Sequence, residues 1–228
     1  MKNIGIVIPA AGQGRRMGKN LNKQFLNLLG KPILYHTIKS FVDWGKAAEI
    51  VVVLNKEEFD HFDLKIKRFF SDMNTRIITA EGGKSRKESV YNGIKALNED
   101  LEYIMIHDGA RPLISVDLIE STYQAVKEFD AVSCGVKVKD TIKIVDESFS
   151  QQTLNRDSLR AIQTPQAFKT DLIISAHKNC SKDTALDDAS LVEELGRNVY
   201  IINGDYNNLK ITTAEDLKPA EMILKERK

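Results

Sequence analysis

Short apolar runs alternate along the chain with segments whose apolar residues recur at helical spacing. Continuous apolar runs are typical of strands that are buried on both faces of a mostly parallel sheet, whereas half-buried strands alternate apolar and polar residues. The runs predict strands at Ile4–Pro9, Glu49–Leu54, Arg76–Thr79, Tyr103–Ile106, Ala131–Gly135 and Val199–Ile202.

Capping residues precede several of the helical segments. Pro32 stands directly before one of them, where a proline suits the first turn of a helix. Ser85 and Glu88 have the spacing of a capping box, and Ser115 is a further N-cap candidate. The alternation of strands with helices predicts an α/β fold, with a doubly wound, Rossmann-like and mostly parallel sheet, in a single domain over residues 1–228.

Segments rich in glycine, proline or charge follow three of the predicted strands. They are Pro9–Gly12, Gly82–Gly83 and His107–Pro112. Ligands of doubly wound sheets bind at the carboxyl ends of the strands. We therefore expect the three segments to converge on one crevice.

Residues 137–163 interrupt the alternation. Val136, Val138, Ile142 and Ile144 are separated by two or four positions, which is a strand period, and no long helix follows them. We interpret this segment as a β-hairpin arm that covers the site, packs on a second subunit, or does both.

The composition is that of an ordinary folded domain. Of the 228 residues, 42% are hydrophobic and 29% are charged, and the formal net charge is +1. A general nucleic-acid binder is usually more basic, so we expect no nucleic-acid partner. The apolar run Ile4–Ala11 is too short for a signal peptide or a membrane span, so we expect a cytoplasmic protein without a membrane partner.

Basic residues are nevertheless concentrated near the N-terminus, where no Asp or Glu precedes Asp43. Such a segment in a neutral protein either forms a solvated basic face or binds one specific anionic ligand. The two cysteines, Cys134 and Cys180, share no metal-ligand spacing with the histidines. We therefore expect no metal site built from protein ligands.

A glycine-rich loop, Pro9–Lys19, leaves the first predicted strand. It does not match a dinucleotide-binding fingerprint, because Met17 stands where the third glycine is needed. It does not match a P-loop either, since Asn20 replaces the Ser or Thr that would bind magnesium. We interpret it as a nucleotide loop of another kind, with Arg16 and Lys23 directed at a polyphosphate; the alternative is a basic surface turn.

Several later residues suit anionic or polyol ligands. The carboxylate of Asp108 can bind a ribose hydroxyl, a substrate hydroxyl or a metal, and Arg111 can bind phosphate through two parallel hydrogen bonds. The alternative for this pair is an ion pair that braces a loop. Thr141, Arg156 and Thr164 offer groups for a second phosphate, although turn and edge-strand chemistry explains them equally well. Lys210 lies just before a helix cap, and its role stays open in the same way.

No catalytic triad and no pair of carboxylates stands out in the sequence. Transfer of a nucleotidyl group to a phosphate needs no general base, because a phosphate monoester is already largely dianionic near neutral pH. The reaction needs positioning, and it needs charge neutralisation by Arg, Lys and Mg²⁺. The predicted strand ends supply residues of that kind.

Eight segments occur in the order of one known family: Pro9–Gly18, Lys23–Leu26, Gly82–Arg86, Asp108–Pro112, Asp140–Thr141, Gln163–Gln166, Asp187–Ser190 and Lys210–Thr212. Through them the chain resembles the 2-C-methyl-D-erythritol 4-phosphate cytidylyltransferase (IspD) family over nearly its whole length. Each segment alone is a weak signal, and together they are specific.

The resemblance implies roles for individual residues. Arg16 and Lys23 would stabilise the transition state around the phosphates of CTP, and Arg156 and Lys210 would position the phosphate of the acceptor for in-line attack. The nucleotide would be bound by Pro9, Ala10, Ala11, Gly12, Gly14, Gly83, Ser89, Asp108 and Gly109. The acceptor would be bound by Asp108, Arg111, Thr141, Arg156, Thr164 and Lys210.

The resemblance also implies the reaction and the assembly. CMP would pass from CTP to 2-C-methyl-D-erythritol 4-phosphate, in the non-mevalonate synthesis of isoprenoid precursors. Mg²⁺ would be bound mainly through the phosphates of CTP. The protein would form a homodimer through the arm at residues 137–163, so that Thr141 and Arg156 act across the subunit boundary.

Two positions depart from the family pattern. Lys84 stands where some members have an acidic residue near the cytosine pocket, and Leu186 stands where some have a threonine that contacts substrate. One alternative is a ribitol-5-phosphate cytidylyltransferase, although the Asp-x-x-Arg-Pro and Asp-x-Ala-Ser regions resemble the methylerythritol enzymes. Another is a non-catalytic nucleotide-binding module that regulates a partner, which would be expected to lack the basic transfer residues.

Overall fold

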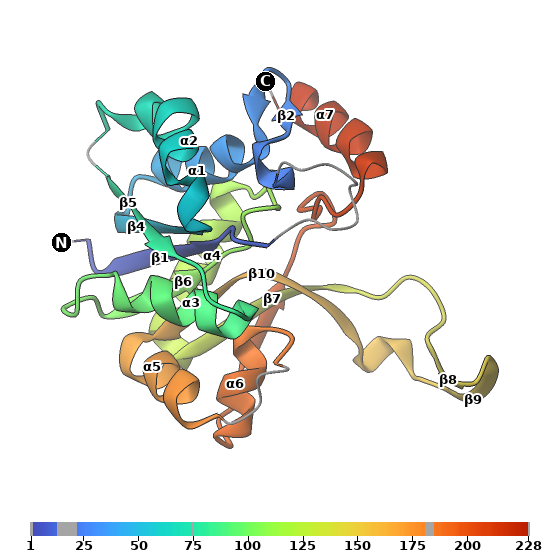
Figure 1. Cartoon of the computed structure of the whole chain (residues 1–228). Helices are drawn as coiled ribbons and strands as arrows, with labels where there is room; N and C mark the ends of the chain where they lie inside the picture. Colours follow the sequence, from blue (N-terminus) through green and yellow to red (C-terminus); the bar gives the residue numbers. More distant parts are fainter. Residues whose placement is uncertain (1, 13–21, 74, 181–184, 228) are drawn as a thin grey trace.

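A seven-stranded sheet forms the centre of the protein (Figure 1). Its strands lie in the order β11 (Tyr200–Asn203), β7 (Ala131–Lys137), β10 (Arg160–Lys169), β6 (Tyr103–Ile106), β1 (Ile4–Pro9), β4 (Ala47–Leu54) and β5 (Arg76–Glu81). Within this described sheet, β10 runs antiparallel to its neighbours β6 and β7, and the other pairings are parallel. The computed structural model describes residues 2–12, 22–73, 75–180 and 185–227.

Helices cover both faces of the sheet (Figure 1). One face carries α1 (Ile33–Trp44), α2 (Phe59–Lys65) and α4 (Val116–Phe129), and the other carries α3 (Arg86–Lys95), α5 (Thr170–Asn179) and α6 (Asp188–Glu194). Alternate residues of a strand enter the two cores, so that Ile6 and Ile8 of β1 join the first and Val7 joins the second. The predicted doubly wound, mostly parallel sheet is confirmed. In the described part of the chain, no helix combines the length and the apolar content needed to cross a bilayer.

A smaller apolar cluster lies under α7 (Leu217–Glu226), next to the short strands β2 (Asn27–Leu28) and β3 (Lys31–Pro32). Ile211 is fully buried in this cluster, and its backbone N–H donates to the carbonyl oxygen of Ala110 at 2.8 Å. The cluster therefore fixes the segment that carries Lys210 against the loop that follows β6.

The predicted elements lie close to their expected positions. β1 and β6 have the predicted bounds, and α1 begins directly after Pro32. At the start of α3, the Ser85 hydroxyl accepts a hydrogen bond from the backbone N–H of Glu88 at 3.1 Å. The Glu88 carboxylate does not complete a standard capping box, because it accepts from the N–H of Lys84, one residue before the cap, at 2.7 Å.

The sequence-based prediction misses β10, although it lies in the middle of the sheet. Proline is uncommon inside a sheet except at a bulge, and this segment holds Pro165 between polar residues. The pairing with β7 shifts register between Gln163 and Gln166, which places Pro165 in such a bulge. The buried amides find partners, since Gln166 donates to the hydroxyl of Ser133 at 3.0 Å and Gln163 donates to the carbonyl oxygen of Asp205 at 2.9 Å.

A hairpin protrudes from the sheet between β7 and β10 (Figure 1). Its strands are β8 (Lys143–Asp146) and β9 (Phe149–Thr153), and every residue of the two is exposed. Apolar side chains share that exposure, and Phe149 is 73% exposed. The structure thus contains the expected hairpin, but residues 160–163 of the predicted arm belong to β10 of the main sheet.

Candidate functional site

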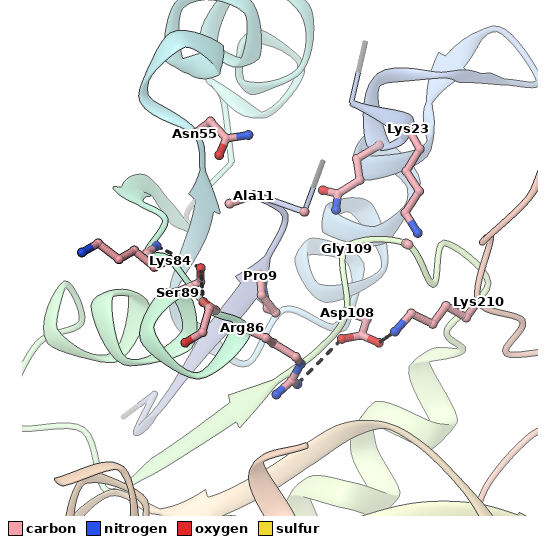
Figure 2. Close-up of a pocket in the computed structure, with 15 residues that line it drawn as sticks. Pro9, Ala11, Lys23, Asn55, Lys84, Arg86, Ser89, Asp108, Gly109 and Lys210 are labelled. Carbon is pink, nitrogen blue, oxygen red and sulfur yellow. Dashed lines mark hydrogen bonds and ion pairs between the residues drawn. The ribbon is translucent and has the colours of Figure 1, made fainter. Parts of the chain in front are cut away.

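The carboxyl ends of the strands border a cavity of about 570 Å³ (Figure 2). The three segments that were expected to converge all contribute to its wall. They supply Pro9, Ala11 and Gly12 after β1, Gly83 after β5, and Asp108 and Gly109 after β6. The predicted crevice is therefore present, and its position follows from the parallel strands that lead into it.

Two glycines allow the loops around this cavity to approach each other. A Cβ on Gly82 would lie 2.5 Å from the Cβ of Ala11, which is closer than real side chains come. A Cβ on Gly83 would collide with the side chain of Glu88. The Ser89 hydroxyl accepts from the N–H of Gly83 at 3.0 Å and donates to the carbonyl oxygen of Ser85 at 2.8 Å. Because its proton is engaged within the protein, Ser89 shapes this loop and does not donate to a ligand in this arrangement.

Lys23 enters the cavity wall from a short 3-10 turn, Lys23–Phe25 (Figure 2). Asn22 ties this turn to the nucleotide loop, since its side-chain amide donates to the carbonyl oxygen of Ala10 at 2.8 Å. The Asn22 side chain also accepts from the N–H of Gln24 at 3.4 Å. The local structure therefore holds the ammonium group of Lys23 at the same cavity as the loop after β1.

Asp108 lies among three cations, two of which, Arg86 and Lys210, appear in Figure 2. Lys210 Nζ is 2.7 Å from Oδ2, Arg86 Nη2 is 3.8 Å from Oδ1, and Arg111 Nε is 3.8 Å from Oδ2. Burial alone would raise the pKa of Asp108, but the charges of Lys210, Arg86 and Arg111 lower it to about 2. The carboxylate is therefore ionised at neutral pH and can accept hydrogen bonds from ligand hydroxyls.

His107 is fully buried beside Asp108 and has a structural role. Burial lowers the pKa of His107 to about 4, so the ring is neutral at pH 7. Its Nε2 lies 3.1 Å from the carbonyl oxygen of Arg111, which only accepts, so Nε2 carries the proton. Nδ1 then accepts from the hydroxyl of Thr164 at 3.2 Å, and that hydroxyl accepts from the N–H of Asp108 at 3.0 Å. This chain of hydrogen bonds fixes the end of β6 to β10.

A second cavity of about 500 Å³ adjoins the first. β10 and the segment around the start of α6 form much of its wall, which includes Arg111 and Thr164. Arg86, Asp108 and Lys210 line both cavities. One charged wall therefore separates two spaces of ligand size.

Arg86 is also held by a buried carboxylate, through the same nitrogen that lies nearest Asp108. Its Nη2 lies 2.8 Å from Oδ2 of Asp188, whose other oxygen lies 3.2 Å from Nε2 of His177. Burial alone would lower the pKa of Arg86, but the carboxylates of Asp188 and Asp108 raise it. The guanidinium is therefore a fixed positive charge in the shared wall.

Arg111 is also fixed, in this case by backbone groups. Its Nη1 donates to the carbonyl oxygen of Asn208 at 2.8 Å, and the Asn208 amide donates to the carbonyl oxygen of Thr164 at 2.8 Å. The sequence left open whether Asp108 and Arg111 bind ligand or brace a loop. The geometry is compatible with both roles. Arg111 Nε lies 3.8 Å from Oδ2 of Asp108, and both residues also line the second cavity.

Not every expected site residue lies at these cavities. Gly14 and Arg16 fall outside the described residues. Thr141 and Arg156 are on the arm and are absent from the described walls of both cavities, and Arg156 Nη1 donates to the carbonyl oxygen of Lys139 at 2.9 Å. Ala10, which was expected to bind the nucleotide, is likewise absent from the described cavity walls, because it is fully buried in the core.

Among the residues at the first cavity to which the sequence analysis assigned no role are Gln24, Asn55 and Arg86. Asn55 directly follows β4, so applying the strand-end rule to that strand would have identified it. Arg86 stands shortly after a glycine pair at another strand end, and its charge was the available signal. Gln24 carries no comparable signal, since a buried amide beside Lys23 is not distinguishable in sequence from an exposed one.

The two departures from the family pattern both lie at the cavities. Lys84 lines the first cavity, and Figure 2 shows its side chain directed away from Asp108. Leu186 lines the second cavity and is 91% exposed. Neither side chain blocks the shared wall.

The described residues do not form a metal site from protein ligands. Among them, no group of three or more His, Cys, Asp or Glu side chains is placed to hold a metal ion. Asp108, the acidic residue that both cavities share, is already surrounded by cations. This donor set fits an anionic ligand that brings its own counter-ion better than a metal bound by the protein.

Two known proteins that are similar to this chain carry the name of one enzyme family. The model of the family described as "IspD: 2-C-methyl-D-erythritol 4-phosphate cytidylyltransferase" matches residues 4–226. A 2-C-methyl-D-erythritol 4-phosphate cytidylyltransferase of Clostridium novyi is 48% identical over 231 residues, which cover 100% of this chain and 98% of that protein. One of Alkaliphilus oremlandii is 45% identical and covers 100% of this chain and 99% of its own length.

A solved structure gives the same result for the fold. The crystal structure of 4-diphosphocytidyl-2C-methyl-D-erythritol synthase from Anaerococcus prevotii superimposes with a TM-score of 0.85 at 32% sequence identity. The match covers 98% of this chain and 99% of that one. The sheet and its helices thus belong to a fold that a similar protein shares over nearly its full length.

Proposed function

The chain belongs to the 2-C-methyl-D-erythritol 4-phosphate cytidylyltransferase family, and on this premise we propose how its two cavities receive the two substrates. It is an enzyme that transfers CMP from CTP to 2-C-methyl-D-erythritol 4-phosphate and releases pyrophosphate. The product is 4-diphosphocytidyl-2-C-methyl-D-erythritol. The observation that supports the proposal is the charged wall shared by two adjoining cavities.

CTP occupies the first cavity. The glycine- and alanine-rich loop after β1 brings backbone N–H groups to this space, which suits phosphate oxygens. Lys23 adds an ammonium group there, and Arg16 belongs to the same loop in the sequence. The loop at Gly83, which Ser89 holds by a hydrogen bond, lies close to the loop after β1 and forms the wall beside the cytosine base. Asp108 accepts hydrogen bonds from hydroxyl groups of the ribose or of the acceptor.

The polyol phosphate occupies the second cavity. Asp108, Arg111 and Lys210 line it and combine one hydrogen-bond acceptor for hydroxyls with two cations for a phosphate. Thr164 lies in the same wall. Because its proton is directed at His107, Thr164 accepts a hydrogen bond from a substrate hydroxyl and does not bind phosphate.

The two cavities place the substrates for in-line transfer. A phosphate oxygen of the acceptor forms a bond to the α-phosphorus of CTP, and the bond from that phosphorus to the β-phosphate oxygen breaks, so pyrophosphate leaves with the bonding electron pair. No proton has to be removed from the dianionic acceptor. The work of the protein is to hold two anions together, which Arg16, Lys23 and Lys210 do by charge neutralisation.

Mg²⁺ accompanies the triphosphate in this proposal. It neutralises charge on the phosphates and on the departing pyrophosphate. The described part of the cavity wall supplies backbone N–H groups and cations rather than a set of carboxylates, which supports an ion that would be bound mainly through CTP.

The arm completes the site from a second copy of the chain. Thr141 and Arg156 lie on it, away from the cavities of their own subunit, and its apolar side chains are exposed. A homodimer formed through the arm buries these side chains and brings Arg156 to the acceptor phosphate of the partner's site. The dimer acts in the cytoplasm, where CTP is available.

Pyrophosphate release tests the proposal. Purified protein with CTP and Mg²⁺ is offered 2-C-methyl-D-erythritol 4-phosphate and, in parallel, ribitol 5-phosphate, with a reaction lacking acceptor as the control. We expect release with the first acceptor alone. Release with ribitol 5-phosphate alone would assign the enzyme to the rival substrate, and silence with both would favour a nucleotide-binding module.

A further inference from the structure

One network of ion pairs joins the two cavities to the interior of the protein. Lys210 contacts Asp108 at 2.7 Å, Asp108 contacts Arg86 at 3.8 Å, and Arg86 contacts Asp188 at 2.8 Å. His177 closes the series at 3.2 Å from Asp188. Figure 2 shows Arg86 and Lys210 reaching Asp108 from opposite sides.

The two cations on either side of Asp108 are anchored very differently. The Lys210 side chain is 42% exposed, and its ammonium group contacts the Asp108 carboxylate at the border of the cavities. Arg86 is 30% exposed, but its guanidinium also contacts Asp188, whose side chain is fully buried. Lys210 can therefore turn to another anion at little cost, whereas Arg86 cannot leave without stranding a buried carboxylate.

Asp188 is itself rigidly placed. Its backbone N–H donates to the side-chain oxygen of Gln166 on β10 at 3.1 Å, at the first residue of α6. Its partner His177 is buried on α5 and stacks on Tyr91 of α3, with 5.6 Å between ring centroids. Three helices and the antiparallel strand thus fix the carboxylate that holds Arg86.

The acceptor phosphate changes the balance of charge at Asp108. In the proposed function Lys210 binds that phosphate, and the Asp108 carboxylate then loses its nearest cation while remaining inside the protein. A buried carboxylate without a counter-ion takes up a proton or moves away. We propose that Arg86, fixed by Asp188, is a further positioning residue of the transfer reaction: it keeps Asp108 ionised and in place while Lys210 binds the acceptor.

This inference rests on the proposed function and predicts something that the proposed function alone does not. Before the acceptor arrives, Lys210 still pairs with Asp108, so loss of Arg86 leaves CTP binding nearly unchanged. After it arrives, the phosphate engages both Lys210 and Arg111, the other two cations near Asp108, so loss of Arg86 leaves Asp108 without a cation of its own in the reacting complex. The defect therefore falls on turnover and not on the affinity for CTP.

The test compares Arg86→Gln, Asp188→Asn and the double variant in the full-length protein. We expect kcat to fall about 100-fold for Arg86→Gln and about 10-fold for Asp188→Asn, with the double variant within about two-fold of Arg86→Gln because Asp188 acts through Arg86. The Kd of CTP, measured by calorimetry without acceptor, stays within about three-fold of wild type. Glu49→Gln is the matched control, since Glu49 is a buried carboxylate 3.5 Å from Arg76, outside the site, and kcat should not change.

Several outcomes would overturn the inference. Unchanged kcat in Arg86→Gln would do so, as would losses that simply add in the double variant. Weaker CTP binding that parallels a lower melting temperature would show a general structural role instead. Arg86 is partly exposed, so Arg86→Gln decides the question even where Asp188→Asn fails to fold. An inactive wild-type enzyme would contradict the proposed function, which keeps the two failures distinct.

Discussion

The crevice and the arm both carry residues expected to bind substrate, but they are built in opposite ways. In the crevice, the side chains of Asp108 and Arg111 are only 13% and 12% exposed, and other parts of the same chain hold each of them. On the arm, Thr141 and Arg156 lie in a segment that is almost entirely exposed. One region is arranged before any ligand or partner arrives, and the other has no comparable support within its own subunit.

The difference indicates where each region obtains its order. The crevice is stabilised by the core of the sheet, so its geometry belongs to the single chain. The arm displays Phe149 and its apolar neighbours to solvent, which is costly unless a second surface covers them. The comparison therefore predicts that crevice variants damage the site of their own subunit and that arm variants damage the site of the partner.

Lys23→Ala tests the crevice and has the largest expected effect. Removing the ammonium group from the triphosphate should lower kcat by about 100- to 1,000-fold while the protein stays folded. Steady-state pyrophosphate release and a thermal unfolding curve measure the two quantities. Near-normal turnover would show that the transition-state role assigned to Lys23 is wrong. Arg16→Ala is expected to behave in the same way.

Arg156→Ala tests the arm. Loss of the guanidinium should raise the KM for 2-C-methyl-D-erythritol 4-phosphate by about ten-fold or more and leave the affinity for CTP unchanged, because in the proposed function the residue contacts the acceptor phosphate. Acceptor titrations at saturating CTP, together with calorimetry for CTP alone, separate these effects. An equal loss of CTP affinity would contradict the assignment of Arg156 to the acceptor phosphate.

Mixing these two impaired variants, at an acceptor concentration well below the KM of Arg156→Ala, sharpens the comparison further. If each site combines a crevice from one subunit with an arm from the other, a Lys23→Ala and Arg156→Ala heterodimer contains one intact site and one site with both defects. Random exchange of subunits should then restore about a quarter of the wild-type activity. No recovery after verified exchange would mean that the arm serves its own subunit.

The smallest expected effect is on the free energy of unfolding. It concerns Glu120, which lies outside both the crevice and the arm. Lys46, Gln124 and Trp44 hydrogen-bond to the Glu120 carboxylate of α4 and lower its pKa to about 2, from an ordinary value of 4.5. A depressed carboxylate pKa stabilises the fold above pH 4.5, and this stabilisation is lost as the pH falls towards 2. Glu120→Gln should therefore cost about 0.5–1 kcal/mol at pH 7, a cost that disappears near pH 2, with kcat unchanged. Chemical denaturation at several pH values measures it, and a cost independent of pH would contradict the charge argument.

Much of the fold could be predicted because its strongest signals are local. β1 and β6 are continuous apolar runs with turn residues directly after them, and α1 follows a proline. β10 escaped prediction because its evidence is not local. Gln163 and Gln166 appear as loop residues until their amides are seen to bond with Asp205 and Ser133, which lie far away in the sequence.

The same distinction between local and long-range signals applies to the residues of the site. Asp108 and Gly83 could be predicted because each stands at a strand end, and the direction of parallel strands brings those ends together. The anchoring of Arg86 by Asp188 could not be predicted, since 102 positions separate the two residues and no periodicity relates them. The sequence shows that a charge is present, but long-range packing determines what holds it.

The wall shared by the two cavities has a consequence for inhibition. A single molecule that joined a cytidine group to a phosphorylated polyol could fill both spaces and contact Arg86, Asp108 and Lys210 from each side. Once one end is bound, a short linker holds the other at an effective concentration of roughly millimolar. Such a bivalent compound would need only modest affinity at each end to bind tightly overall, and a resistance mutation at any of the three wall residues would also impair the enzyme's own reaction.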